Sequence, residues 1–455
     1  MEEAVCIEIQ QELKASIEIE TENTESQNVA NTSNENKSQY ERMVSALEIM
    51  IEKPEPSFSF MCHIKRIPDH LRKVNEQAYS PMIISIGPFH HFDKKLQTME
   101  MFKVRYLKSF MKLANVNLKD LVNAIGAMEE QIYCCYAETS FGMDKDDFFK
   151  VILVDAIFIL ELIFRNVIKR WEPDDLFIID KMDFIICDLV LFENQLPFFV
   201  LEVLFNLIYP KFLNSSLIDL TFEFFEPFNV QKITPKNVKI EHFTDLIRIF
   251  QLPQLQSLPT RITGSGMVTL SGSATQLYDA GVKFEESTST CLLDLHYEKG
   301  VLKMPRLKLD DQTEALVRNV MALEQFSLWN NVYLTDYFIF LDSLINTIED
   351  INILCDRGIL VNRLGDNKAA FSSVKKLITG IKLSHVNSDF TIICEGLNKF
   401  YNKPFHRLKV TLSVTTLKNQ YFNNPWRGAG TIAACLLLLL TLIQTIMSIL
   451  QVARA

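Results

Sequence analysis

The chain has few of the residues that end helices and build turns. Its 455 residues include 14 Gly and 15 Pro, which disfavours a fold of many short strands joined by turns. None of its nine Cys residues belongs to a C-x-x-C pair, so neither a zinc ribbon nor a thioredoxin-like redox motif is expected. Most of these Cys stand among apolar neighbours, which indicates buried, reduced thiols of the kind usual in the cytosol. The predicted fold class is mainly α-helical.

A basic excess is also missing. The net charge is −10, and residues 1–37 carry nine Glu against Lys14 and Lys37, a net charge of −7 that leaves −3 for the rest of the chain. A surface for nucleic acid needs clustered Lys and Arg, so no nucleic-acid partner is expected. The first 37 residues are polar and poor in aromatic side chains, and this composition predicts a disordered acidic arm.

The start of the chain has no basic segment followed by an apolar one, which argues against a signal peptide. At the other end, Thr431–Leu450 contains no charged residue. A helix of this length reaches about 30 Å, the thickness of a bilayer's hydrocarbon core, so a transmembrane helix is favoured over a buried core helix. Lys409, Lys418 and Arg427 precede this run and only Arg454 follows it, so the positive-inside rule places the preceding residues in the cytosol. Together these features predict a single-pass, tail-anchored protein of the plasma membrane or an endomembrane, with membrane lipid as a partner.

Two small residues at the start of the apolar run, Gly430 and Ala434, are four positions apart. Such a step lets two transmembrane helices pack closely, so these residues are candidates for the contact face of a homodimer. The same step is common in helices that stay unpaired, and the sequence leaves both alternatives open.

The region ahead of the apolar run is long enough for two helical lobes. Proline and glycine residues place the boundary between them in an irregular region. The expected segments are a disordered arm (1–37), a helix and linker (38–56), lobe 1 (57–209), the irregular region (210–273), lobe 2 with a small β element (274–424) and the transmembrane helix (428–452).

Apolar residues at helical spacing predict the main helices. A hairpin-like piece is expected where Cys291–His296 and Arg306–Leu309 bracket Lys299 and Gly300. The predicted helices include Leu118–Glu138, Asp144–Arg170, Met182–Tyr209 with a break at Pro197, Thr335–Leu354, and Val238–Gln251 as the sole helix of residues 214–259.

Half of the eight His residues fall within Cys62–His91. Imidazole is a common metal ligand, but no Cys or carboxylate stands at ligand spacing beside them, so hydrogen bonds in caps and turns are the favoured role. Within this stretch Met82–Ile86 predicts a short β or extended piece, and His90 and His91 are candidates for a functional or structural polar cluster.

Acidic residues also occur inside apolar helical runs. Asp155 and Glu161 lie six positions apart, on different faces of a helix, so they do not form a carboxylate pair. Each is expected to accept hydrogen bonds from a helix terminus or from an Arg.

At three places an acidic residue stands beside an amide side chain. These neighbours either build one polar site shared between three helices or form three separate buried hydrogen-bond networks, and the second alternative is favoured. The residues are Glu130 and Gln131; Glu193, Asn194 and Gln195; and Glu324 and Gln325.

Several distinct short motifs occur along the chain. They are Ile67-Pro68, Leu71-Arg72, Ala78-Tyr79, Ser85–Pro88 with His90-His91, Leu191–Phe198, Thr275–Phe284 and Asn424–Trp426. On these residues the chain resembles the plant DUF247 proteins, from about residue 64 to the C-terminus. The resemblance implies a plant membrane protein whose domain has no assigned reaction. Some grass members of that family are linked to self-incompatibility as pollen-side recognition factors, a role that no residue here marks.

No residue set indicates a particular reaction. The stretch Arg261–Ser273 lacks the GK[ST] ending of a phosphate-binding loop, and no catalytic residue, metal ligand or cofactor is assigned. The favoured function is a protein-interaction or recognition module held at a membrane, with protein partners of unknown identity. The alternative is a hydrolase or transferase of unfamiliar type, with Glu193, Asp155, Glu324, His90 and His91 as its candidate residues.

Overall fold

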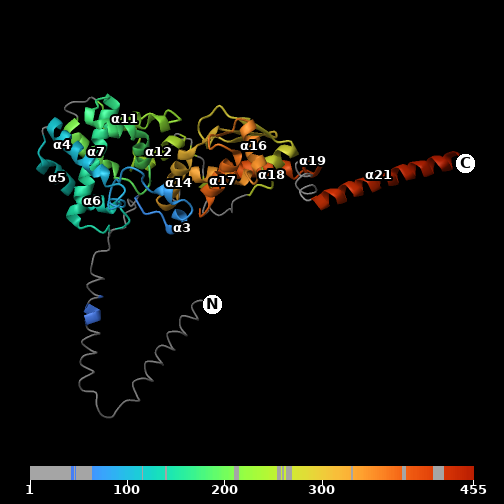
Figure 1. Cartoon of the computed structure of the whole chain (residues 1–455), viewed down its shortest axis with the longest axis horizontal. Coiled ribbons are helices and arrows are strands. Elements are labelled where there is room, and N and C mark those ends of the chain that lie inside the picture. Colours follow the sequence, from blue (N-terminus) through green and yellow to red (C-terminus); the bar gives the residue numbers. More distant parts are fainter. Residues whose placement is uncertain are drawn as a thin grey trace, which may run out of the picture. The chain divides into compact units, whose positions relative to one another are not determined.

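The structure is a computed structural model of the chain. It describes residues 42–45, 47, 64–114, 116–138, 141–209, 215–253, 258, 261–262, 269–328, 331–381, 386–412 and 425–454. The chain forms two units, Met1–Ser59 and Phe60–Ala455. In the first unit residues 42–45 are helical, and the arm predicted over 1–37 lies outside the described residues. The second unit is mainly α-helical with a small β element, as predicted (Figure 1).

One long helix, α7 (Lys145–Ile168), is the centre of the first half of the second unit (Figure 1). It begins after Asp144, whose side chain accepts a hydrogen bond from the Asp147 amide at 2.8 Å, and it ends where Lys169 adopts a left-handed conformation. The helices α4 (Thr98–Ala114), α5 (Leu118–Gly126), α10 (Phe198–Ile208) and α11 (Leu217–Phe224) pack against it. The remaining helices of this half are α3 (Asp69–Arg72), η1 (Glu76–Tyr79), α6 (Glu129–Cys134), η2 (Pro173–Asp175), α8 (Leu176–Asp180), α9 (Met182–Leu189), η4 (Glu226–Phe228) and α12 (Phe243–Gln251).

The predicted break in Met182–Tyr209 is confirmed. Helix α9 ends at Leu189, and Pro197 is the N-cap residue of α10. A proline fits this position because the first amides of a helix have no partner within the helix. Residues 190–197 therefore form a buried turn between two core helices.

Leu118–Glu138 was predicted as one helix and is two. Helix α5 ends at Gly126, a weak helix former, and α6 begins at Glu129.

Capping boxes explain two further corrections. Thr335–Leu354 is divided into α15 (Tyr333–Leu344) and α16 (Ile348–Asp356), because Thr347 and Asp350 cap a new helix reciprocally. The prediction of a sole helix in 214–259 is wrong, because α11 begins there at a capping box formed by Ser216 and Asp219.

The second half contains the β element. Strands β2 (Lys283–Glu286), β4 (Val301–Met304) and β3 (His296–Glu298) form a sheet in the order β2-β4-β3, with β2 parallel and β3 antiparallel to β4. The predicted hairpin is thus present around Lys299 and Gly300, both of which have positive φ. Its bounds were wrong, because β5 (Leu307–Leu309) pairs in parallel with the unpredicted β6 (Leu360–Asn362). A further antiparallel pair joins β1 (Arg261–Ile262) and β7 (Val386–Asn387).

The other helices of this half are α13 (Ala274–Ala280), α14 (Asp311–Phe326), α17 (Asn367–Ile378), α18 (Ser388–Tyr401) and α19 (Pro404–Leu412). One hydrophobic cluster includes residues from Ile64 to Leu397 and so draws on both predicted lobes. The division into lobes stays a prediction, and the two halves are joined by direct hydrogen bonds: the Asn319 side chain accepts from the Phe192 amide (2.8 Å) and donates to the Ala78 carbonyl (2.7 Å).

The last helix is α21 (Pro425–Arg454). Its stretch Ile432–Ile449 has a mean hydropathy of 2.4, and none of it is buried. Among the described residues this is the one helix long and apolar enough to cross a membrane. The apolar stretch Phe198–Leu207 in α10 is shorter, and much of it is buried in the core.

Candidate functional site

Residues 82–87 pair with no strand, and 84–87 are buried, so the backbone amides of this segment need other acceptors. Asp188, at the end of α9, supplies three of the hydrogen bonds. Its carboxylate accepts from the amides of Met82 (2.8 Å), Ile83 (2.6 Å) and Ile84 (2.9 Å). Burial raises the pKa of Asp188 to about 6 although these three amides oppose the shift. The segment Met82–Ile86, predicted as a short β or extended piece, is not a strand. Three of its amides bond to the side chain of Asp188, where those of a strand would bond to a neighbouring strand.

Asn194 continues this anchoring from the turn between α9 and α10. Its Oδ1 accepts from the Ile86 amide (2.6 Å), and its Nδ2 donates to the carbonyl oxygens of Ile84 (3.0 Å) and Asp188 (2.9 Å). Three of the four hydrogen-bonding positions of this buried amide are used for backbone contacts.

Gln195, the next residue, fixes the turn itself and the start of α12. Its Nε2 donates to the carbonyl oxygens of Leu189 (2.6 Å) and Leu191 (2.7 Å). Its Oε1 accepts from the Phe243 amide at 2.9 Å, which satisfies one of the free amides at the N-terminus of α12.

Glu193 connects the same turn to the chain near residue 67 and to His90. Its carboxylate accepts from the Ile67 amide and from Arg72, and its Oε2 lies 3.1 Å from Nε2 of His90. Burial alone would raise the pKa of Glu193, but His90, the Ile67 amide and Arg72 outweigh it and hold the pKa below its ordinary value. The carboxylate is thus a buried anion with three partners.

The two candidate histidines have different surroundings. His90 contacts Glu193, whereas the ring of His91 packs edge-on against Phe92 at 5.1 Å between centroids. Burial lowers the pKa of His91, which favours its neutral form. Across the described residues no three His, Cys, Asp or Glu side chains converge as a metal site would need, and His63 lies outside those residues.

Asp155 holds the next part of the extended segment from α7. Its Oδ2 accepts from the Gly87 amide at 2.8 Å, and its Oδ1 lies 2.6 Å from Nζ of Lys103, a fully buried lysine of α4. Burial raises the pKa of Asp155 to about 6, and Lys103 opposes that shift. Glu100 lies 2.6 Å from the same Lys103 nitrogen, so the lysine has two carboxylate neighbours.

Glu161 belongs to a separate network on α7. Arg165 donates to Glu161 (3.0 Å) and to Asp175 (2.6 Å), and Tyr209 donates to Glu161 (2.9 Å). The expected hydrogen bond from an Arg is found at Glu161. Asp155 differs from the prediction, because its partners are the amide of Gly87, which lies outside any helix, and Lys103.

Glu324 lies on α14 and serves as an acceptor at the start of α15. It accepts from the amides of Tyr333 (3.1 Å), Leu334 (3.0 Å) and Thr335 (2.8 Å) and lies 3.3 Å from Nε of Arg248. Gln325 is half-buried beside it.

The three places where an acidic residue stands beside an amide side chain do not form one shared site. Glu130 and Gln131 are exposed on α6, and the Glu193 group stands in a turn although all three were predicted on helices. The structure thus places Glu193 and Glu324 in different hydrogen-bond sets.

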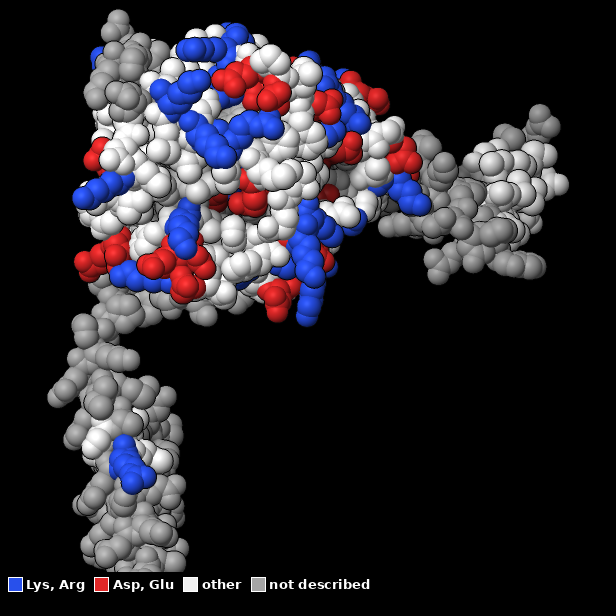
Figure 2. Space-filling model, turned by 60° about the vertical axis from the view of Figure 1, so that its left-hand side comes forward, with Lys and Arg blue, Asp and Glu red and all other residues white. Residues whose placement is uncertain are grey.

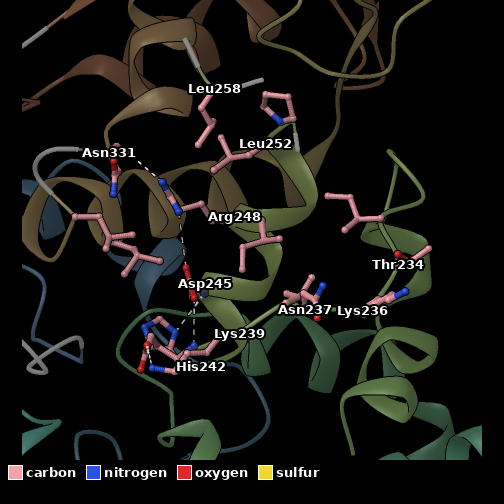
Figure 3. A pocket seen from close by; sticks show the side chains of 17 residues that line it. Thr234, Lys236, Asn237, Lys239, His242, Asp245, Arg248, Leu252, Leu258 and Asn331 are labelled. Atoms are coloured by element: carbon pink, nitrogen blue, oxygen red, sulfur yellow. Dashed lines mark hydrogen bonds and ion pairs between the residues drawn. The ribbon is translucent and has the colours of Figure 1, made fainter. Parts of the chain in front are cut away.

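A pocket of about 710 Å³ lies beside α12, and the sequence did not single it out (Figure 3). Three polar residues on one face of α12 and its N-cap line the pocket: His242 at the N-cap, Asp245 one turn later and Arg248 one turn after that (Figure 3). Arg248 donates to the carbonyl oxygen of Asn331 at 2.9 Å and contacts Glu324 on its other side. The only signal of this pocket in the local sequence is that His242, Asp245 and Arg248 are polar at every third position, next to a helix face that is strongly apolar.

Comparisons with known proteins agree over most of the chain. The family model described as a plant protein of unknown function, DUF247, matches residues 64–440. UPF0481 protein At3g47200 of Arabidopsis thaliana is 30% identical over 427 residues, which cover 86% of this chain and 87% of that protein. A second UPF0481 protein of Arabidopsis thaliana, At3g02645, is 23% identical over 482 residues, 84% of this chain and 89% of that protein. No solved structure matches.

Proposed function

The chain belongs to the DUF247 family of plant proteins, and we propose that it is a protein-interaction module held at a membrane by its last helix. The observation that carries the proposal is α21, in which Ile432–Ile449 is apolar and none of it is buried. In water such a surface is unfavourable by about 25 cal/mol per Å² of apolar area, so a lipid environment suits it better. The body ahead of α21 is then cytosolic, because Lys409, Lys418 and Arg427 precede the span.

The membrane part of the proposal is tested by alkaline extraction of cell membranes that contain the full chain. We expect the wild type to stay in the membrane pellet and the double variant Leu438→Arg, Leu440→Arg to be released, because each charge at mid-membrane costs about 3 kcal/mol. The control is Ile392→Arg, which places one Arg at an exposed position of α18. Retention of the double variant in the pellet contradicts a role of α21 as anchor.

Orientation has its own readout. An N-terminal tag on the full chain in sealed vesicles is expected to be digested by added protease if the body is cytosolic. Protection of the tag would reverse the proposed topology and leave the anchor itself in place.

A second observation supports an interaction role for the body. Helices α4 and α8 meet where Phe102 stacks on Phe177 with 5.0 Å between centroids. The residues that precede the two rings in the chain are strongly exposed, Met101 at 69% and Leu176 at 71%. Large apolar side chains that gather on a surface are typical of protein-binding faces. Figure 2 shows both basic and acidic side chains on the face that it draws.

Proximity labelling with the full chain tests the interaction role. The double variant Met101→Glu, Leu176→Glu is expected to lose specific neighbours that the wild type labels. Ile392→Glu is the matched control, because Ile392 is 66% exposed on a different helix. Identical labelling by wild type, double variant and control would remove the α4–α8 face from the proposal.

The enzymatic alternative rests on the contact between Glu193 and His90, a carboxylate and an imidazole 3.1 Å apart. The same carboxylate holds the Ile67 amide and Arg72, so structural contacts already account for it. Glu193→Gln separates the two roles. A well-folded variant that binds its partners normally but has lost a measurable hydrolase or transferase activity would favour the enzyme.

Pairing of two chains through Gly430 and Ala434 is part of the proposal. Both lie in α21, and a Cβ on Gly430 would meet no atom within 4 Å. Gly430→Leu should therefore leave the single chain unaffected and weaken only a close helix pair. Cross-linking in membranes that gives the same dimer yield for wild type and Gly430→Leu would dismiss this contact face.

A further inference from the structure

We propose that the pocket beside α12 is a binding site for a small organic acid, a molecule with an apolar body and one carboxylate group. The proposal concerns the pocket alone and does not depend on the membrane anchor. Its volume of about 710 Å³ falls within the range of roughly 300–1,000 Å³ typical of small-molecule sites.

Apolar side chains form much of the pocket wall. Ile249 and Leu252 come from α12 and the residue that follows it, and Leu258 lies beyond them (Figure 3). Leu323 and Leu328 close the wall from the end of α14 and the residues after it. This wall would cover the apolar body of a ligand and exclude water from it.

Arg248 supplies the group that would recognise the acid. Its side chain is 9% exposed, and its Nε and Nη2 contact Glu324 (3.3 Å) and the Asn331 carbonyl (2.9 Å). Its Nη1 lies 3.9 Å from Oδ1 of Asp245, which is too long for a hydrogen bond. A guanidinium has five N–H donors, so Arg248 keeps donors for an incoming acceptor. Its neighbours hold the guanidinium in place, which lowers the entropic cost of ordering this side chain when a ligand binds.

The charged groups at the pocket favour a ligand with no more than one negative charge. Lys239 lies 3.1 Å from Glu241, so these two offset each other. Arg248 lies 3.3 Å from Glu324 and 3.9 Å from Asp245, and Lys236 adds a further cation to the lining. Because two carboxylates already lie beside Arg248, a single carboxylate fits here better than a phosphate dianion, which would add a second negative charge next to them.

The probe for the test is 4-(trifluoromethyl)phenylacetate, observed by fluorine NMR with the full chain in lipid nanodiscs. Empty nanodiscs give the baseline for partition into lipid. A ligand of this size reaches a Kd of about 1 mM at ordinary efficiency per atom, which line broadening detects. The neutral amide of the same probe is expected to bind about tenfold more weakly, because it lacks the charge that Arg248 and Lys236 would meet.

Two variants locate the binding. Ile249→Trp fills the pocket from a half-buried position and should abolish broadening by the acid, whereas Ile392→Trp on α18 should leave it unchanged. Lys236→Glu reverses an exposed lining charge and should weaken the acid at least fivefold while the amide is unaffected. Unchanged thermal midpoints confirm that both variants fold.

Three results would overturn the proposal. They are no binding of the acid above the nanodisc baseline, equal binding of acid and amide, and full binding of the acid by a folded Ile249→Trp variant.

Discussion

Replacing Asn194 by Ala tests whether the turn between α9 and α10 anchors the extended segment. The side chain is 1% exposed and makes one hydrogen bond to the Ile86 amide and one each to the carbonyls of Ile84 and Asp188. The Asp188 carbonyl keeps a second donor, the Leu191 amide at 3.3 Å. The variant therefore leaves two buried backbone groups unsatisfied, at about 1–3 kcal/mol each. We expect the free energy of local opening to fall by about 3–5 kcal/mol.

Hydrogen exchange measured by mass spectrometry reads this loss locally. A fall of about 3–5 kcal/mol speeds exchange in a peptide over residues 82–91 by about 140-fold to about 4,000-fold, since 1.4 kcal/mol is a factor of ten. Local exchange reports the opening of this segment itself, whereas urea or thermal unfolding reports on the larger cooperative unit that contains it.

The matched control is Asn123→Ala, an Asn that is exposed on α5. It should change exchange in its own peptide by only a few fold. An exposed amide side chain bonds to water, so its removal leaves no buried group unsatisfied. If Asn194→Ala speeds exchange over 82–91 less than fivefold, its hydrogen bonds do not hold the segment and the reasoning is refuted.

Three further predictions concern buried groups. Asp188 has a native pKa of about 6 against 3.8 for the free side chain. Its contribution to stability is therefore complete below about pH 4 and is lost as the pH rises through 6. In urea unfolding, the free energy of unfolding of the wild type should fall by about 3 kcal/mol relative to that of Asp188→Asn between about pH 4 and 6. Gly87→Ala should lower stability about 1–3 kcal/mol more than Gly142→Ala in the same assay, since both have φ near 70° but only at Gly87 would a Cβ meet a backbone oxygen at 2.8 Å. Arg165→Met strands two buried carboxylates and should cost about 3–5 kcal/mol in thermal unfolding, against about 0–1 for Arg66→Met at an exposed ion pair; equal losses would contradict this.

Where the sequence predicted an element well, the decisive chemistry is local. Asp144 caps α7 and Pro197 begins α10, and each acts within a few residues of its own position. The misjudged boundaries are local too, because Thr347 with Asp350 forms a capping box that an apolar pattern alone does not reveal. Greater weight on caps would have divided that helix correctly.

The polar contacts of the candidate site are a different matter. Glu193 and the Ile67 amide are 126 residues apart in the chain, and Asn319 and the Phe192 amide are 127 apart. Sequence spacing shows that a buried acid needs partners but not which backbone group supplies them. The pocket beside α12 was missed for the same reason, since its wall includes Leu323 and Leu328 from a distant helix.

The motifs that relate this chain to its family describe its fold more than its chemistry. Glu193, Asn194 and Gln195 make most of their hydrogen bonds with backbone groups, and the amides of Ile86 and Gly87 donate to side chains elsewhere in the chain. A side chain whose polar atoms are occupied in this way is costly to change whatever the protein binds, because an unsatisfied buried group remains. Exposed apolar side chains such as Met101 and Leu176, the apolar wall of the pocket beside α12 and the surface of α21 present groups of another kind, and the experiments above are directed there.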